Sequence, residues 1–161
     1  MISSSGFGGG GEQINIAFSS GDLILEGVCH LPQGDGPFPI VVLCHPHPLY
    51  GGSMFNNVIL ALSSVLEGKK IAAFRFNFRG VSGSQGNFGG GIEEQEDVVA
   101  ALDYVVSQKG VDVERIGLAG YSFGAGVALP VALGDNRVKA LSLISPPIAA
   151  QDIAKLKNYV R

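Results

Sequence analysis

The serine at position 122 stands between two glycines in the pentapeptide Gly-Tyr-Ser-Phe-Gly, residues 120–124. An apolar run that begins near Arg115 leads into it, and a stretch rich in Ala, Val and Leu follows. This order is typical of a strand, a sharp turn and a helix, with Ser122 strained at the tip of the turn. Gly120 and Gly124 are small enough to let strand and helix approach. The pattern predicts an exposed hydroxyl at a helix N-terminus, where partial positive charge favours a developing anion.

Two further loops follow apolar, strand-like runs in the same way. Residues 45–52 follow the run at residues 40–44, and residues 79–91 follow the run at residues 71–78. The carboxyl ends of parallel strands meet at one edge of a sheet, and function in such sheets sits at that edge. We therefore expect both loops to lie beside Ser122.

The alternation of strand and helix patterns predicts the architecture. Two strand-like runs flank a turn signal near the start of the chain, and we expect them to form an antiparallel hairpin. Strands and helices then alternate, which indicates a mainly parallel sheet with helices on both faces, an α/β three-layer sandwich with about six strands. The strands are expected at residues 12–18, 23–31, 40–44, 71–78, 115–119 and 138–144, and the helices at 56–67, at 93–108, after residue 122 and at 151–160.

The composition is that of one folded domain with a large apolar core. The chain has 161 residues, of which 46% are hydrophobic and 16% charged, and its formal net charge is −3. Scattered Lys and Arg argue against nucleic acid as a partner, and no apolar run is long enough to span a membrane. The first residues lack a basic segment followed by an apolar one, and Cys29 and Cys44 fall in apolar runs. We therefore expect no signal peptide, no disulfide, no membrane partner and a cytoplasmic location.

The first eleven residues, MISSSGFGGGG, are of low complexity. Sequence of this kind is expected to be flexible. We therefore assign residues 1–11 to a flexible tail and residues 12–161 to the folded domain.

Three segments together resemble the α/β-hydrolase superfamily, and within it the dienelactone-hydrolase-like and acylpeptidase-like serine hydrolases. They are LCHPHPLYGGSM at residues 43–54, RFNFRGVSGSQG at residues 75–86 and GYSFGAG at residues 120–126. The resemblance covers residues 14–161. It departs from the family mildly at Ser82, which stands where the family usually has the second glycine of Arg-Gly-x-Gly-x-Ser.

The resemblance implies hydrolysis of a carboxylic ester, thioester or related acyl bond, with Ser122 as the nucleophile. The oxyanion hole would combine the backbone N–H of Phe123 with a second N–H from the loop after residue 44. Because the prolines of that loop have no N–H, the candidates are His47 and then Leu49 or Tyr50, and the family position favours His47. The implied partner is a small-molecule acyl substrate, and the chemistry needs no cofactor and no metal.

The end of the chain departs from the family more seriously. The family orders its triad as serine, acid, histidine, yet no histidine follows Ser122. A serine without a base is a weak nucleophile. We therefore expect a hydrolase fold that lacks its C-terminal strands, in which residues 138–144 form an exposed edge strand open to homo-oligomer formation. The alternative is a catalytically inactive hydrolase-fold protein that acts in binding or assembly.

Several side chains near this edge admit a second interpretation. His45 and His47 could serve as substitute bases or metal ligands, or else as a loop-orienting side chain and a backbone donor. Asp152 could be the triad acid, although a helix cap is the expected role. Arg79 is expected to anchor its own loop. The acidic residues at positions 93, 94, 96 and 97 are expected in a solvated first helical turn.

The glycine spacing at positions 120, 124 and 126 also matches short-chain dehydrogenases, in which glycines let a dinucleotide pyrophosphate approach a helix. That motif belongs after the first strand of its domain, and the Tyr-x-x-x-Lys pair of that chemistry is missing from the sequence. We therefore prefer the hydrolase interpretation. Pro130 is expected to kink or end the helix that follows Ser122.

Overall fold

A computed structural model describes residues 11–147, 154, 156 and 157 of the chain. The tail predicted at residues 1–11 lies outside the described residues except for Gly11, whose N–H donates to Glu67 Oε1 at 3.0 Å. The helix predicted at residues 151–160 also lies mostly outside them, as does the candidate acid Asp152.

Six strands form one sheet in the order β1-β2-β4-β3-β5-β6. β1 pairs antiparallel with β2, and β2 antiparallel with β4, whereas β4, β3, β5 and β6 run parallel. All the predicted strands are present, and the largest difference is in β5, which begins at Val111 rather than at residue 115. The strands are β1 (Glu12–Ser20), β2 (Leu23–Leu31), β3 (Phe38–Cys44), β4 (Ala72–Phe76), β5 (Val111–Tyr121) and β6 (Val138–Ile144).

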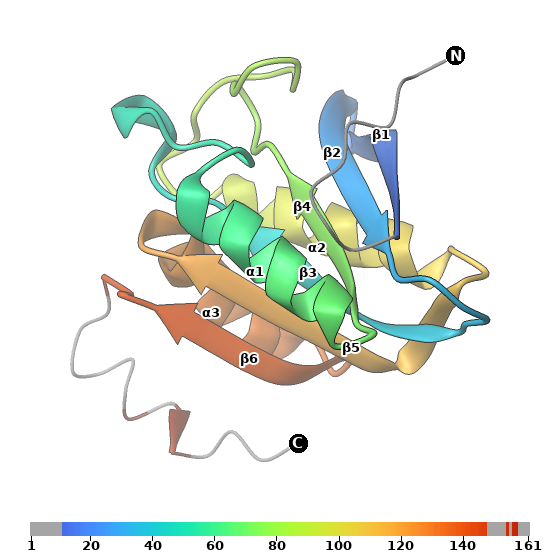
Figure 1. The fold of residues 1–161 in the computed structure, drawn as a ribbon. Coiled ribbons are helices and arrows are strands. Elements are labelled where there is room, and N and C mark those ends of the chain that lie inside the picture. Colours follow the sequence, from blue (N-terminus) through green and yellow to red (C-terminus); the bar gives the residue numbers. More distant parts are fainter. Residues whose placement is uncertain (1–10, 148–153, 155, 158–161) are drawn as a thin grey trace.

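Helices cover both faces of the sheet (Figure 1). α1 (Asn57–Gly68) lies on one face, and α2 (Glu94–Val106) and α3 (Phe123–Gly134) lie on the other. A short 3-10 helix, η1 (Pro48–Tyr50), follows β3. The predicted α/β three-layer sandwich with a mainly parallel sheet is confirmed. None of the described helices is long and apolar enough to span a membrane.

The two faces of the sheet bury apolar cores of different size. A small cluster lies under α1, and a larger one lies under α2 and α3. The rings of Phe74, Phe76 and Phe78, on β4 and just after it, are fully buried in the larger cluster. Every residue of β4 is buried, as expected for an inner strand that is covered on both faces.

The order of the strands reverses around β3. The chain passes from β3 to β4 on one side and then returns to β5 on the other side of β3. In such sheets ligands bind outside the carboxyl ends of the strands at this reversal. Cys44, the last residue of β3, pairs with Gly120 of β5, so the chain leaves both strands at neighbouring points just before His45 and Ser122.

The last elements of the described chain are a proline-containing helix and an edge strand. Pro130 lies inside α3 and does not end it, since the helix continues to Gly134. β6 is the outermost strand of the described sheet, and Lys139, Ala140 and Ser142 on it are exposed. The expectation of an exposed strand at residues 138–144 therefore agrees with the described part of the fold.

Candidate active site

Ser122 lies at the sharp turn between β5 and α3. Its φ of 53° and ψ of −117° form a strained conformation that residues with a side chain rarely adopt. The Ser122 N–H donates to Ile144 O at 2.9 Å, and Ser122 O accepts the N–H groups of Ala125 and Gly126 at 3.0 and 3.2 Å. Its hydroxyl makes no capping hydrogen bond to α3. The predicted strand, strained turn and helix are therefore present, with the hydroxyl at the helix N-terminus.

Two glycines leave no room for a side chain beside this turn. A Cβ at Gly120 would lie 2.5 Å from Ala125 N and closer still to Gly124 O. A Cβ at Gly124 would lie 2.5 Å from His45 O and closer still to Cys44 O. Backbone atoms cannot swing aside, so only glycine fits at both positions. Gly124 also allows α3 to approach the end of β3 closely.

The loop after β3 brings His47 against the first residue of α3. The ring centroids of His47 and Phe123 lie 4.8 Å apart. His47 O accepts the N–H groups of Tyr50 and Gly52 at 3.1 and 3.0 Å, which closes the loop into a tight turn. Within the part of the chain that the structure describes, no hydrogen bond uses the backbone N–H of His47 or of Phe123. Both groups are therefore available to a ligand.

His45 is fully buried and connects the loops after β3 and β4. Its Nε2 accepts the Phe78 N–H at 3.1 Å, so Nδ1 carries the proton and donates to Pro46 O at 2.7 Å. Burial lowers the pKa of His45 to about 4 despite the hydrogen bond to Pro46, and the ring is neutral. With both ring nitrogens engaged, His45 orients the two loops and does not take a proton from Ser122.

The other two of the chain's three histidines are not placed as bases either. His47 Nδ1 accepts the Leu49 N–H at 3.2 Å, so the neutral ring carries its proton on Nε2. His30 pairs with Ala73 near the start of β4, away from the carboxyl ends of the strands, and its Nε2 accepts from Arg75 Nε at 2.9 Å. The geometry therefore does not support histidine as a substitute base or metal ligand at this edge.

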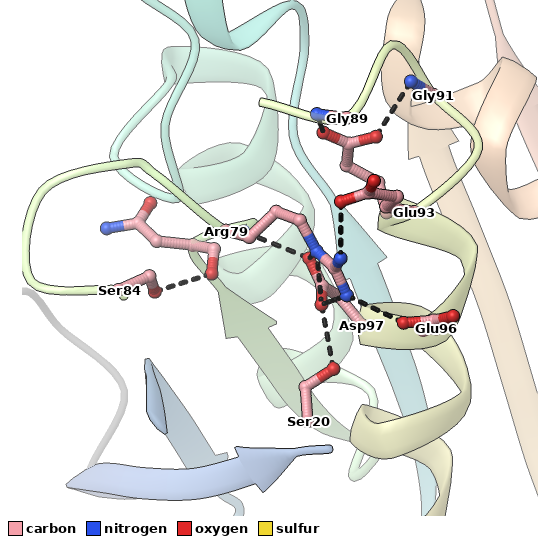
Figure 2. Close-up of polar contacts among 10 residues, drawn as sticks. Ser20, Arg79, Ser84, Gly89, Gly91, Glu93, Glu96 and Asp97 are labelled. Atoms are coloured by element: carbon pink, nitrogen blue, oxygen red, sulfur yellow. Dashed lines mark hydrogen bonds and ion pairs between the residues drawn. The ribbon is translucent and has the colours of Figure 1, made fainter. Parts of the chain in front are cut away.

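Arg79 anchors the loop after β4 to α2, as predicted. Its Nη2 donates to Asp97 Oδ1 at 2.8 Å, and its Nη1 and Nη2 donate to Glu93 and Glu96 at 2.9 and 3.1 Å (Figure 2). Asp97 also accepts the backbone N–H of Arg79 at 3.0 Å and the Ser20 hydroxyl at 2.8 Å. The hydrogen bonds that Arg79 donates to Asp97 raise the pKa of Arg79 above its ordinary value, so the guanidinium stays charged.

The carboxylate of Glu94 holds the end of the same loop. One of its oxygens accepts the Gly89 N–H and the other accepts the Gly91 N–H, both at 2.7 Å. The loop thus wraps around a buried anion, and two backbone donors satisfy its charge.

The burial of two acidic side chains corrects the sequence prediction. Glu93 and Glu96 are 61% and 74% exposed, as expected of a solvated first turn, but Glu94 and Asp97 are 0% exposed. Positions 94 and 97 are three residues apart and share the helix face that buries Val98. This spacing on an apolar face, together with an arginine in the preceding loop, is a signal from which the burial could have been predicted.

Two residues of the loop after β4 were not predicted to shape the site. Asn77 is fully buried, and its side chain accepts the Met54 N–H at 2.8 Å and donates to Glu26 Oε1 at 2.7 Å, which ties the loop before α1 to the end of β4. Ser82, which replaces a family glycine, has a φ of 47°. Glycine adopts this φ without strain, so the replacement leaves the backbone strained.

The structure therefore brings Ser122, Phe123 and His47 together at the carboxyl ends of β3 and β5. Among the described residues, no hydrogen-bonded carboxylate and histidine lie beside them. The site offers a hydroxyl, two backbone donors and a helix N-terminus, which suit attack on a carbonyl carbon and stabilisation of the resulting oxyanion.

Replacing Ser122 by glycine is expected to relieve the strain of the turn. Glycine adopts a φ of 53° without the strain that a Cβ brings, so Ser122→Gly is expected to be more stable than Ser122→Ala by about 1 kcal/mol. Urea denaturation of the two variants measures the difference. Both variants lack the hydroxyl, so equal stabilities would show that the turn is not strained.

The buried neutral histidines are expected to make stability depend on pH. Burial lowers the pKa of His30 and of His45 from 6.5 to about 4, and the Arg75 charge adds to the effect at His30. As pH falls below 6.5 the unfolded chain binds these protons and the folded protein does not, so stability is complete above pH 6.5 and declines toward pH 4. We expect a loss of about 3 kcal/mol per histidine in chemical denaturation. Carboxylates titrate in the same pH range, so the readout is the difference in free energy of unfolding between the parent protein and His45→Asn at each pH. A difference that does not change with pH would contradict the prediction.

Removing the charge of Asp97 is expected to destabilise the protein strongly. Asp97→Asn leaves the buried Arg79 without its closest anion, and the expected loss in free energy of unfolding is about 3 kcal/mol. The matched control is Asp103→Asn on the same helix, since Asp103 accepts from Arg137 at 2.6 Å but is 64% exposed. The control is expected to cost less than about 1 kcal/mol. Similar losses for both variants would contradict the role given to Asp97.

Comparison with known proteins places this chain in a family. The X-Pro dipeptidyl-peptidase (S15) family matches residues 24–159 of the chain. The uncharacterized protein RP471 of Rickettsia prowazekii is 38% identical over 110 residues, which cover 68% of this chain and 46% of the Rickettsia protein. The chain thus spans about half the length of this curated relative.

Two solved structures share the fold at appreciable identity. An alpha-beta serine hydrolase homologue from Coxiella burnetii has a TM-score of 0.79 and 36% identity, and the match covers 89% of this chain and 67% of that protein. The protein XC6422 from Xanthomonas campestris, described as a serine hydrolase without lid, has a TM-score of 0.75 and 34% identity, over 86% of this chain and 63% of that protein. The chain belongs to the α/β-hydrolase superfamily, within the X-Pro dipeptidyl-peptidase (S15) family.

Proposed function

We propose that Ser122 is the nucleophile of a serine hydrolase that cleaves a carboxylic ester, thioester or related acyl bond of a small molecule. The observation that carries the proposal is the strained turn that holds the Ser122 hydroxyl at the N-terminus of α3. Phe123 directly follows Ser122, the His47 ring lies against that of Phe123, and no hydrogen bond within the described part of the chain uses either backbone N–H. The serine hydrolase descriptions of the Coxiella and Xanthomonas relatives support it.

The proposed reaction follows from this arrangement. Ser122 Oγ attacks the carbonyl carbon of the substrate and gives up its proton to a base. The N–H groups of His47 and Phe123 bind the oxygen that becomes negative. When the tetrahedral intermediate collapses, the bond to the alcohol or thiol breaks and the leaving group takes the proton. Water then attacks the acyl-serine and releases the acid.

The proposal assigns the base to a residue that this sequence does not contain. His30, His45 and His47 have their acceptor nitrogens engaged in hydrogen bonds to N–H donors. A serine hydroxyl without a base reacts slowly, while the oxyanion donors retain much of their effect. A small base supplied from solution is therefore expected to activate Ser122.

The test is labelling of the chain with a fluorophosphonate, followed by peptide mass spectrometry, with and without imidazole as an added base. We expect slow labelling of Ser122 alone and an increase of about tenfold or more with imidazole. Ser122→Ala is expected to abolish the label. The matched control is Ser145→Ala, since Ser145 is an exposed serine with a φ of 46° at the end of the neighbouring strand β6. This variant is expected to label like the parent.

Two outcomes would overturn parts of the proposal. Absence of Ser122 labelling in a folded sample with imidazole would favour the alternative of an inactive hydrolase-fold protein. Fast stoichiometric labelling without imidazole would show that the chain supplies its own base.

A further inference from the structure

Four rings, from two loops and the start of α3, gather beside Ser122. The ring of His47 lies 4.6 Å from that of Tyr50, 5.1 Å from that of Phe88 and 4.8 Å from that of Phe123, measured between centroids. Phe88 and Phe123 lie 5.7 Å apart. We call these four residues the ring cluster. It joins the loop after β3, the loop before α2 and the first residue of α3, which directly follows Ser122.

The ring cluster continues into apolar side chains that face solvent. Tyr50 is 86% exposed, and Leu49 in the same loop and Ile92 in the loop that carries Phe88 are 66% and 72% exposed. Exposed apolar side chains that gather at one place mark a surface that binds a ligand or partner. Here they belong to the two loops that flank the Ser122 turn, so the candidate ligand is the substrate of that site.

The charged side chains near the ring cluster bind one another and not its rings. The charges of the loop before α2 pair with one another, since Arg79 binds Glu93, Glu96 and Asp97. Within the described residues, no hydrogen bond or ion pair of a charged side chain reaches a ring of the cluster. The surface therefore offers apolar contact without a charge that would recognise a charged acyl group.

Glu94 keeps the loop that carries Phe88 in place. Its carboxylate accepts the N–H groups of Gly89 and Gly91, the residues just after Phe88. The backbone at Gly91 is then so close to the ring of Phe123 that a Cβ there would lie 3.3 Å from it. The cluster is thus a preformed surface, and a ligand that binds it does not have to order the loop.

We propose that the ring cluster is the acyl subsite of the Ser122 site and that it selects uncharged, apolar acyl groups. This inference rests on the proposed function. The carbonyl oxygen of the substrate sits on the N–H groups of His47 and Phe123, and its acyl chain lies across the rings of Phe88 and Tyr50. Each methylene that leaves water for this surface adds affinity.

The test measures binding without turnover, by NMR titration of the chain with acetamide, butanamide, hexanamide and the charged analogue succinamate. These amides carry the acyl group but are poor substrates. We expect the dissociation constant to fall about tenfold from acetamide to hexanamide. Succinamate is expected to bind more weakly than butanamide. The amide signals of residues 47, 88 and 123 are expected to shift.

Variants of the ring cluster test the assignment. Phe88→Ala and Tyr50→Ala are expected to remove most of the preference for hexanamide. Tyr50 is 86% exposed, so its variant folds even if Phe88→Ala does not. The matched control is Phe55→Ala, because Phe55 is 55% exposed but its ring lies 5.0 Å from the Arg75 guanidinium carbon rather than in the cluster. This control is expected to keep the full preference.

The outcomes separate this inference from the proposed function. Equal affinity for acetamide and hexanamide, or a preference that survives both ring variants, would overturn the subsite even if fluorophosphonate labels Ser122. A preference for hexanamide that depends on Phe88 and Tyr50 supports the subsite even if Ser122 is never labelled.

Discussion

The close approach of Gly124 to the carbonyl oxygens of Cys44 and His45 is the contact on which the site depends. At this contact the first turn of α3 packs directly on the end of β3, and the loop after β3 therefore passes beside the start of α3. His47 and Phe123 meet across this contact, with their rings 4.8 Å apart. A side chain at position 124 would push the start of α3 away from the end of β3. His47 would then move away from Phe123 and from the Ser122 turn, although position 124 belongs to none of them.

Buried charges provide the second constraint, because they fix a loop that has little regular structure. Arg79 and Asp97 connect the end of β4 with α2, and Asp97 reaches back to Ser20 at the end of β1. Glu94 accepts hydrogen bonds from the backbone N–H groups of Gly89 and Gly91. Charged hydrogen bonds are stronger than neutral ones, and they are most effective where the charge is shielded from water. The glycine-rich segment after β4 thus keeps a defined shape beside Ser122.

Most of the fold could be predicted from the sequence, because periodicity and short-range sterics determine it. The strands follow from apolar runs such as residues 40–44, and the turn at Ser122 follows from glycines two positions away on either side. The spacing of Glu94 and Asp97 on the apolar face of α2 was a signal of their burial, but their partners, loop N–H groups and residues as distant as Ser20, come close only in the folded protein. The role of His45 likewise depends on the N–H of Phe78, which comes close only in the folded sheet.

Through the hydrogen bond from the Ser122 N–H to Ile144 O, the motions of β6, the outermost strand of the described sheet, reach the Ser122 turn. Ile144 is the last residue of β6, and strand ends at the margin of a sheet open more often than the centre does. Each opening removes one support of the strained turn, so Ser122 shares the fluctuations of the sheet margin. A neighbour paired along β6 would damp these fluctuations and lengthen the time that Ser122 spends in its strained conformation.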